Sequence, residues 1–227
     1  MSRDFPGTNS NFLSISNPPG GLDITGTAMT IMAWINPDVV VANAQIAGKD
    51  IVSSNPRQYS LLISGGSKVR FFIIDSGGGV DFVDSPSAPA TSAWHHWAAV
   101  KDATGASAMR IYLDGVLAAS VTSNRSIADT AGNFRIGNRD TNDFAFDGKI
   151  QDVAVYNAAL TVDEIASIAK GVSPQMVRRP NLVAHYPLWG NSSGDEADLT
   201  GGVATLTETG TVAVGASGPP IAPYIIQ

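Results

Sequence analysis

The densest cluster of polar side chains between two expected strands lies at residues 138–143, which are Asn-Arg-Asp-Thr-Asn-Asp. These side chains offer both hydrogen-bond donors and acceptors, as the rim of a carbohydrate or protein site requires. Trp189, beside Gly190 and a polar stretch, is the tryptophan that packing constrains least, and an indole face can stack on a sugar ring. The expected ligand contacts are therefore Asn138, Arg139, Asp140, Asn142, Asp143 and Trp189. The alternative for the loop is a solvated connection rich in turn-forming residues.

Residues suited to catalysis or transition-metal binding are few. His95 and His96 are adjacent, so on a strand they point to opposite faces and cannot jointly hold a metal or form a dyad. We expect one to be satisfied in the core and the other to be exposed, while His185 stands alone. The chain has no cysteine, which excludes disulfides, thiolate metal sites and thiol nucleophiles.

The overall charge argues against two classes of partner. The chain has 14 basic and 20 acidic residues, a net charge of −6, and no basic run longer than the pair Arg178-Arg179. Nucleic acid and anionic membranes are therefore disfavoured as main partners. No apolar run approaches the ~20 residues of a membrane helix, and residues 1–12 lack a signal-peptide pattern, so we expect a soluble chain without a secretion address.

The elements that must position the polar loop are short strands. Charged residues make up only 15% of the chain, and its 23 glycines and 13 prolines require frequent turns. Segments rich in β-branched and aromatic residues recur between turn-forming clusters. We expect strands near residues 12–15, 29–36, 45–49, 59–64, 68–75, 95–101, 109–113, 116–120, 133–136, 148–156, 182–188 and 204–207.

A hairpin and a helix have the clearest local signals. Asp114-Gly115 is typical of a type I′ turn; it puts Met109, Ile111 and Leu113 on a core face and Arg110 and Tyr112 on a solvent or ligand face. Near residues 161–171, Thr161 and Glu164 form a capping box, Leu160 and Ile165 are placed as a hydrophobic staple, and Gly171 ends the helix. Its expected apolar stripe is Val162, Ile165 and Ile168.

Several stretches together resemble the laminin G-like branch of the concanavalin A-like lectin/glucanase group. They are FPGTN (5–9), FLSI (12–15), LDITG (22–26), MTIMAWINP (29–37), WHHWAAV (94–100), IYLDG (111–115), IGN (136–138), FDGKIQDVAVYN (146–157), ALT (159–161) and EI (164–165). Their order and spacing over about residues 4–170 make the resemblance specific. It implies an all-β fold, an antiparallel two-sheet jelly-roll sandwich with one short helix.

The last fifty residues depart from the family order. LVAHYPL (182–188), DLTGG (198–202) and LT (206–207) resemble a stretch that precedes the opening strands in many members, whereas here it comes last. The chain therefore resembles a circular permutation, which a jelly roll with neighbouring termini tolerates. We expect residues 1–227 to form a single domain, in which residues 180–227 supply closing strands and a C-terminal tail.

The resemblance also bears on carboxylates. Glucanases of the wider group use two glutamates a few residues apart on one strand, but Glu164 is accounted for by its helix cap, and Glu196 and Glu208 have no paired carboxylate at strand spacing. The chain is therefore not expected to be an enzyme. Family members often bind Ca²⁺, and Asp152 and Asp198 match carboxylate positions of relatives, with Asn11 as a weaker third ligand. The alternative is that these are ordinary turn residues.

The favoured function is a noncatalytic surface or structural binding module of a bacteriophage virion, either a head decoration protein or a tail adhesin. Its partners would be other virion proteins or a surface glycan, in repeated or self-associated copies at the virion surface. The alternatives are an extracellular or cell-surface carbohydrate-binding lectin module and a β-glucan hydrolase.

Overall fold

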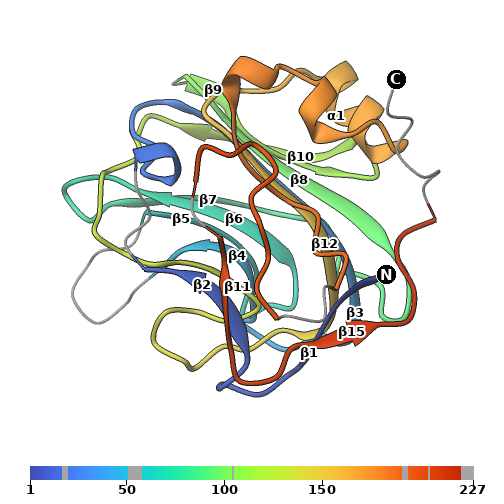
Figure 1. Cartoon of the computed structure of the whole chain (residues 1–227). Coiled ribbons are helices and arrows are strands. Elements are labelled where there is room, and N and C mark those ends of the chain that lie inside the picture. The colour runs from blue at the N-terminus through green and yellow to red at the C-terminus, as the bar shows by residue number, and fades with distance from the viewer. Residues whose placement is uncertain (17–19, 51–57, 104, 191–193, 204, 221–227) are drawn as a thin grey trace.

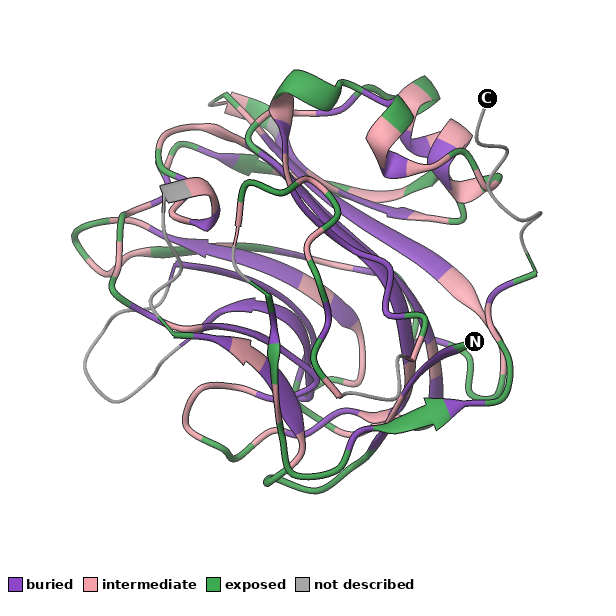
Figure 2. Ribbon diagram, viewed as in Figure 1, coloured by how far each residue is buried: buried purple, intermediate pink, exposed green. Residues whose placement is uncertain are grey.

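Two antiparallel sheets pack face to face in the computed structural model, which describes residues 1–16, 20–50, 58–103, 105–190, 194–203 and 205–220 (Figure 1). One sheet has eight strands and the other has seven. This arrangement confirms the predicted jelly-roll sandwich. The buried residues gather between the sheets, as the purple segments of Figure 2 show.

The eight-stranded sheet follows the order β10 (Val116–Ser123), β9 (Gly105–Leu113), β8 (His95–Asp102), β3 (Ala28–Val39), β12 (Asp147–Tyr156), β1 (Ser2–Pro6) and β15 (Ala213–Gly215), and β13 (Leu182–Tyr186) pairs with β12 beside this path. The seven-stranded sheet follows the order β14 (Thr207–Thr209), β2 (Phe12–Ile15), β11 (Phe134–Ile136), β4 (Gln45–Lys49), β5 (Tyr59–Ile63), β6 (Val69–Ile74) and β7 (Val80–Asp84).

Most strands expected from the sequence are present within a few residues. Ala204, the start of the last expected strand, lies outside the described residues, and the strand nearest to it is β14. Sequence analysis missed β1, β7 and β15. β1 lacks the apolar pattern of a buried strand, because two of its buried residues, Ser2 and Arg3, are polar. β7 is an exposed edge strand with two aspartates, and β15 has only three residues, so neither shows a clear strand pattern.

The central strand β3 is buried on both faces. Ile31, Ala33 and Ile35 belong to the core between the sheets, whereas Met32 belongs to a second apolar cluster on the outer face. The nearly continuous apolar sequence of β3 follows from this double burial.

The β9–β10 hairpin turns at Asp114 and Gly115, whose φ values of 50° and 82° confirm the predicted positive-φ turn. Met109 and Ile111 are in the core as expected. The prediction that Tyr112 faces solvent or a ligand is wrong, because Tyr112 is buried in the outer cluster together with Ile165 of the helix.

The α-helix α1 (Val162–Ala169) has the predicted capping box between Thr161 and Glu164. Ile165 and Ile168 are buried, but Val162 is 50% exposed, so its assignment to the apolar stripe is wrong: at the first position of the helix it lies outside the contact with the sheet. The short 3₁₀ helices are η1 (Gly20–Leu22), η2 (Pro174–Met176) and η3 (Arg179–Asn181). In the described part of the chain, no helix has the length and apolarity needed to cross a membrane.

Residues near the two termini meet along β12. β1 pairs with the first half of β12, from Asp147 to Ile150, and β13 pairs with its second half, from Val153 to Tyr156. β15 then pairs with β1, and β14 pairs with β2 of the other sheet. The segment that follows η3 therefore adds strands to both sheets (Figure 1).

Candidate functional site

The polar loop at residues 138–143 connects β11 of one sheet to β12 of the other. Its base is closed by backbone hydrogen bonds from Gly137 N to Ile46 O and from Phe146 N to Gly137 O, at 3.1 and 2.8 Å. Gly137 has a φ of 85°, and a Cβ there would lie 2.2 Å from the ring of Phe5. Glycine is required at this position because both the conformation and the close approach exclude a side chain.

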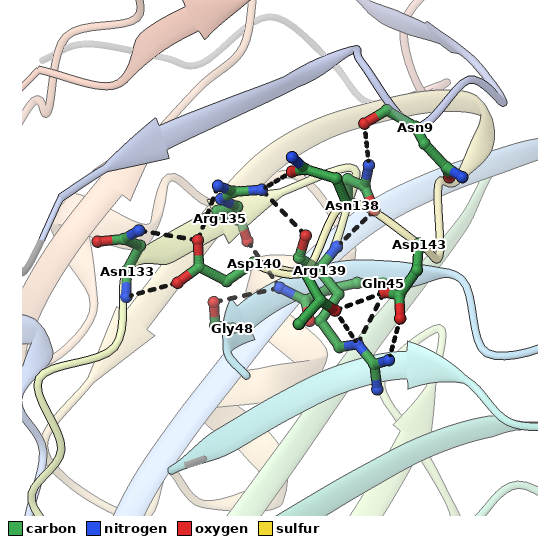
Figure 3. A network of polar contacts seen from close by, with 11 residues as sticks. Asn9, Gln45, Gly48, Asn133, Arg135, Asn138, Arg139, Asp140 and Asp143 are labelled. Carbon is green, nitrogen blue, oxygen red and sulfur yellow. Dashed lines mark hydrogen bonds and ion pairs between the residues drawn. The ribbon is translucent and has the colours of Figure 1, made fainter. Parts of the chain in front are cut away.

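Asn138 holds the loop from inside. Its side chain is fully buried; Nδ2 donates to Asn9 O at 2.8 Å, and Oδ1 accepts from the amides of Arg139 and Phe144 at 2.7 and 3.1 Å (Figure 3). The side chain is therefore committed to the protein and does not present its amide to solvent.

Asp140 is the partner of a largely buried arginine. Arg135, on β11, lies 2.7 Å from Asp140 and donates to Arg139 O at 3.0 Å and to the side chain of Asn142, while Asn133 Nδ2 donates to Asp140 at 2.8 Å (Figure 3). Burial lowers the pKa of the Arg135 guanidinium, and the charge of Asp140 opposes this shift. Sequence analysis missed Arg135, although an arginine in a short apolar strand requires a buried partner.

The accessible part of the loop is formed by Arg139, Asn142 and Asp143. Arg139 Nε donates to Asp143 and to Thr141 Oγ1, both at 3.0 Å, and its guanidinium lies 4.2 Å from the centre of the Phe144 ring. Burial raises the pKa of the Asp143 carboxyl, but hydrogen bonds from Arg139 and Thr141 outweigh it, so the pKa lies below its usual value. The loop thus presents an ionised carboxylate beside a guanidinium that lies over an aromatic ring.

Trp189 lies away from this loop. The neighbouring Gly190 packs against Ser2 and Val214, at the start of β1, whereas the loop contacts the chain beyond the other end of β1, at Asn9. A five-residue strand spans roughly 15 Å. Trp189 is 46% exposed, but the structure does not unite it with the other predicted ligand contacts.

The three predicted calcium ligands are not gathered together. Asp152 is buried on β12, where Oδ1 lies 2.6 Å from Nε2 of His185, and Asp198 contacts the same residue through the His185 backbone amide at 2.9 Å. Asn11 lies beside the other sheet, where Oδ1 accepts from Thr211 N at 3.1 Å.

The Asp198 carboxylate is hydrogen-bonded within its own turn. Its carboxylate accepts from the amides of Thr200, Gly202 and Val203 at 3.1, 3.2 and 3.0 Å, and from the Thr200 hydroxyl. Over the described ranges, no three His, Asp or Glu side chains form a group that could hold a metal ion. Asp198 thus acts as the organiser of a turn, and calcium binding stays a prediction.

The adjacent histidines differ as expected in burial but not in hydrogen bonding. His95 is partly exposed and its Nδ1 lies 2.7 Å from Asp114. His96 is 1% exposed, packs against Trp34 with ring centres 5.4 Å apart, and neither ring nitrogen has a hydrogen-bond partner among the described residues. The expectation of a satisfied core histidine is therefore wrong. Burial lowers the pKa of His96 to about 4, which keeps the ring neutral.

A family model of the concanavalin A-like lectin/glucanases superfamily matches residues 7–166. The chain belongs to this superfamily. The match runs from the end of β1 into α1, so the strands β13, β14 and β15 lie beyond it. Among curated proteins, no sequence matches the chain.

Solved structures share the fold of this superfamily member at low sequence identity. A candidate carbohydrate-binding protein from Bacteroides ovatus ATCC 8483 is 22% identical with a TM-score of 0.70; the alignment covers 98% of this chain and 62% of that protein, so this chain spans less than two thirds of it. The heptameric SAP-like pentraxin from Limulus polyphemus is 16% identical with a TM-score of 0.54, covering 91% and 94%. Domain 4 of an extracellular arabinanase from Geobacillus stearothermophilus, solved with arabinotriose, is 18% identical with a TM-score of 0.50, covering 66% and 70%.

The glutamates of this superfamily member are engaged in structural contacts. Glu164 caps α1 and lies 2.6 Å from Arg178. Glu196 and Glu208 both contact Arg3: Arg3 Nε lies 3.5 Å from Glu196, and the guanidinium also binds Glu208. Arg3 is 1% exposed, so both glutamates are ion-paired with a buried guanidinium.

Proposed function

We propose that the chain is a noncatalytic carbohydrate-binding module whose ligand contacts the accessible part of the loop, Arg139, Asn142 and Asp143. The observation that carries this proposal is the ion pair of Arg139 and Asp143, which hydrogen bonds to Thr141 and a contact with the Phe144 ring hold in place, while Asn138 accepts a hydrogen bond from the Phe144 amide. Donors and acceptors held in place before binding lose little conformational entropy when sugar hydroxyls dock.

The comparisons support a carbohydrate as the ligand class. One neighbour of similar fold is described as a candidate carbohydrate-binding protein, and another was solved with a bound arabinotriose. Saccharides also suit a polar, partly exposed loop with an aromatic ring beneath it better than an apolar ligand does.

The contacts of the three glutamates support binding without catalysis. Hydrolysis requires two carboxylates flanking an accessible glycosidic bond. In the described part of the chain, Glu164 caps α1, and Glu196 and Glu208 form ion pairs with the buried Arg3. The β-glucan hydrolase alternative predicts release of reducing sugars from β-glucan, which a reducing-sugar assay measures directly.

A glycan array with the purified chain tests the proposed function. We expect hits within one sugar class and at least tenfold weaker binding for Asp143→Ala and Asn142→Ala. The matched control is Asp102→Ala, which removes a similarly exposed carboxylate paired with Arg110 at 2.8 Å on β8 and β9, and it should bind normally. Absence of glycan hits, or equal losses in the control, would contradict the proposal.

A second measurement distinguishes a role on a virion from a role outside a cell or on its surface. A head decoration or tail adhesin role predicts that the purified chain assembles in repeated copies onto capsids or tails, at the virion surface. The extracellular or cell-surface lectin alternative predicts glycan binding without such assembly. Cosedimentation with purified capsids, together with the array, separates these two predictions.

A further inference from the structure

A small cavity lies on the side of the molecule formed by η2, η3, β13 and the turn of Asp198. Its volume is about 170 Å³, and its lining includes Gln175, Arg179, Leu182, Val183, Thr200 and Gly202. This volume is equivalent to between five and six water molecules at roughly 30 Å³ each, enough for one small polar ligand. The cavity is separate from the loop of the proposed function, which joins β11 to β12.

Arg179 distinguishes this cavity from the rest of the surface. Each other arginine in the described ranges forms an ion pair with an aspartate or glutamate, while Arg179 has none, in a chain with 20 acidic residues. Surface arginines in an acidic protein readily find a carboxylate, so the one that lines a cavity without a protein partner is available to an external anion.

The neighbouring residues hold Arg179 in this position. Arg178 has a left-handed backbone, with a φ of 39°, and its side chain is fixed to α1 by Glu164 at 2.6 Å and to Ala159 O at 3.0 Å. Pro180 follows at the start of η3 and restricts the backbone further. The Arg178 side chain is therefore bound to Glu164 of α1 and to Ala159 O, whereas Arg179 lines the cavity.

The other cavity residues supply a hydroxyl-binding group and complete the wall. Gln175 donates Nε2 to Leu199 O at 3.2 Å, which anchors the amide and leaves its Oε1 as an acceptor. Leu182 and Val183 of β13 belong to the lining, and Gly202 keeps the wall open because it has no side chain. The Thr200 hydroxyl is already bonded to Val183 O and Asp198.

We infer that this cavity binds the carboxylate-bearing ring of a sugar acid, with the carboxylate on Arg179 and a ring hydroxyl on Gln175. A guanidinium favours a planar carboxylate because two parallel hydrogen bonds can form. Binding of an anion at Arg179 is inferred from the cavity alone, whereas the identification of this anion as a sugar acid rests on the proposed carbohydrate function.

Calorimetric titration of the whole chain with D-glucuronate tests the inference, with D-glucose, acetate and inorganic phosphate as comparison ligands. We expect glucuronate to bind, and glucose and acetate to bind at least tenfold more weakly. Equal binding of glucose would remove the role of the carboxylate. Equal binding of acetate or phosphate would reduce the site to an anion site and overturn the sugar-acid assignment.

Three variants localise the binding. Arg179→Gln removes the charge and Gly202→Val fills the cavity while the net charge stays constant; both should weaken glucuronate binding at least tenfold. Lys170→Gln, an equal charge change at an exposed position outside the cavity lining, should have no effect. Unchanged binding in Arg179→Gln or Gly202→Val would overturn the assignment.

A fourth variant separates this site from the proposed function. Asp143→Ala should lose array binding and retain glucuronate binding, because the two sites lie on different elements. Loss of both ligands in Asp143→Ala would place glucuronate at the loop and overturn the cavity site. Array binding that persists in Arg179→Gln, which retains the loop, would leave the proposed function intact even if the cavity fails.

Discussion

The Nε2 atom of His185 lies 2.6 Å from Oδ1 of Asp152, and this buried contact joins β13 to a bulge in β12. Asp152 lies where the register between β12 and β3 shifts, with a φ of 58°. The bulge turns the aspartate towards β13, so the contact connects residues 33 positions apart in two paired strands.

Two substitutions of Asp152 should differ in their effect on stability. Asp152→Ala removes the acceptor for His185 and places alanine in a left-handed conformation, so we expect the free energy of unfolding to fall by about 2 to 4 kcal/mol. Asp152→Asn keeps an acceptor and tolerates the backbone, and should cost at least about 1 kcal/mol less. Urea unfolding measures both; equal losses would mean that the side-chain contact contributes little.

Arg3 should be among the most sensitive positions in β1. Arg3→Met would leave the carboxylates of Glu196 and Glu208 without the guanidinium that both contact, and would remove the 2.6 Å hydrogen bond to Gly194 O. Breaking a buried ion pair in this way costs about 3 to 5 kcal/mol.

The control for Arg3 is Arg110→Met. Arg110 also pairs with a carboxylate, Asp102, at 2.8 Å, but the side chain of Asp102 is 47% exposed. We expect a loss of at most about 1 kcal/mol there. Chemical denaturation of the two variants compares them; similar losses would show that Arg3 does not tie the N-terminal strand to residues 194–208.

Much of the fold could be predicted because hydrophobic alternation and turn residues are local signals. The β9–β10 turn at Asp114-Gly115 and the capping box at Thr161 follow from neighbouring residues alone. β1 could not be predicted in this way, because its buried Arg3 is compatible with a strand only through Glu196 and Glu208 at the far end of the chain.

The candidate site shows the same limit. The polar loop was recognisable between two strands, but the sequence does not reveal which of its side chains face inward. Asn138 is buried because it binds Asn9 O, 129 residues away, and Asp140 is held by Arg135 in a neighbouring strand. These contacts depend on the tertiary fold, so residue type alone assigns Asn138 and Asn142 the same role.

The calcium prediction is tested by thermal melting with saturating calcium and with chelator. Asp198 is hydrogen-bonded within its own turn and Asn11 lies beside the other sheet, so an unchanged Tm would count against the predicted site. A stabilisation by calcium that disappears in Asp198→Asn would instead establish the predicted site, since ligand binding to the folded state raises Tm.

Gly137 should tolerate no side chain at the base of the loop. Gly137→Ala would place a Cβ 2.2 Å from the buried ring of Phe5 and would also strain a φ of 85°. Gly26→Ala is the matched control, because Gly26 has a φ of 91° but no described atom within 4 Å of the position that its Cβ would take.

The two glycine variants separate strain from overpacking. Backbone strain should cost about 1 to 2 kcal/mol in both, and the clash with Phe5 should cost a further 1 to 3 kcal/mol, roughly, in Gly137→Ala alone. Comparison of their unfolding midpoints in urea decides the point. Equal midpoints would show that Phe5 can move aside without loss of packing.

His96 should make stability depend on pH. Its pKa is lowered to about 4 in the folded state, first by burial, which the charges of Asp152 and Asp114 only partly offset; the ordinary value is 6.5. Between these values the unfolded chain binds more protons than the folded chain, so stability is complete above pH 6.5 and falls as the pH drops towards 4. The loss is about 1.4 kcal/mol per pH unit within this window, or about 3 kcal/mol in total.

His96→Phe isolates this contribution. The variant keeps a ring beside Trp34 but has no proton to bind, so the stability difference between variant and wild type should shift in favour of the variant as the pH falls from about 7 to about 4.5. Carboxylates titrate in both proteins and cancel in the difference. Urea unfolding at several pH values measures it, and a difference that stays constant with pH would mean that His96 is protonated, or neutral, equally in both states.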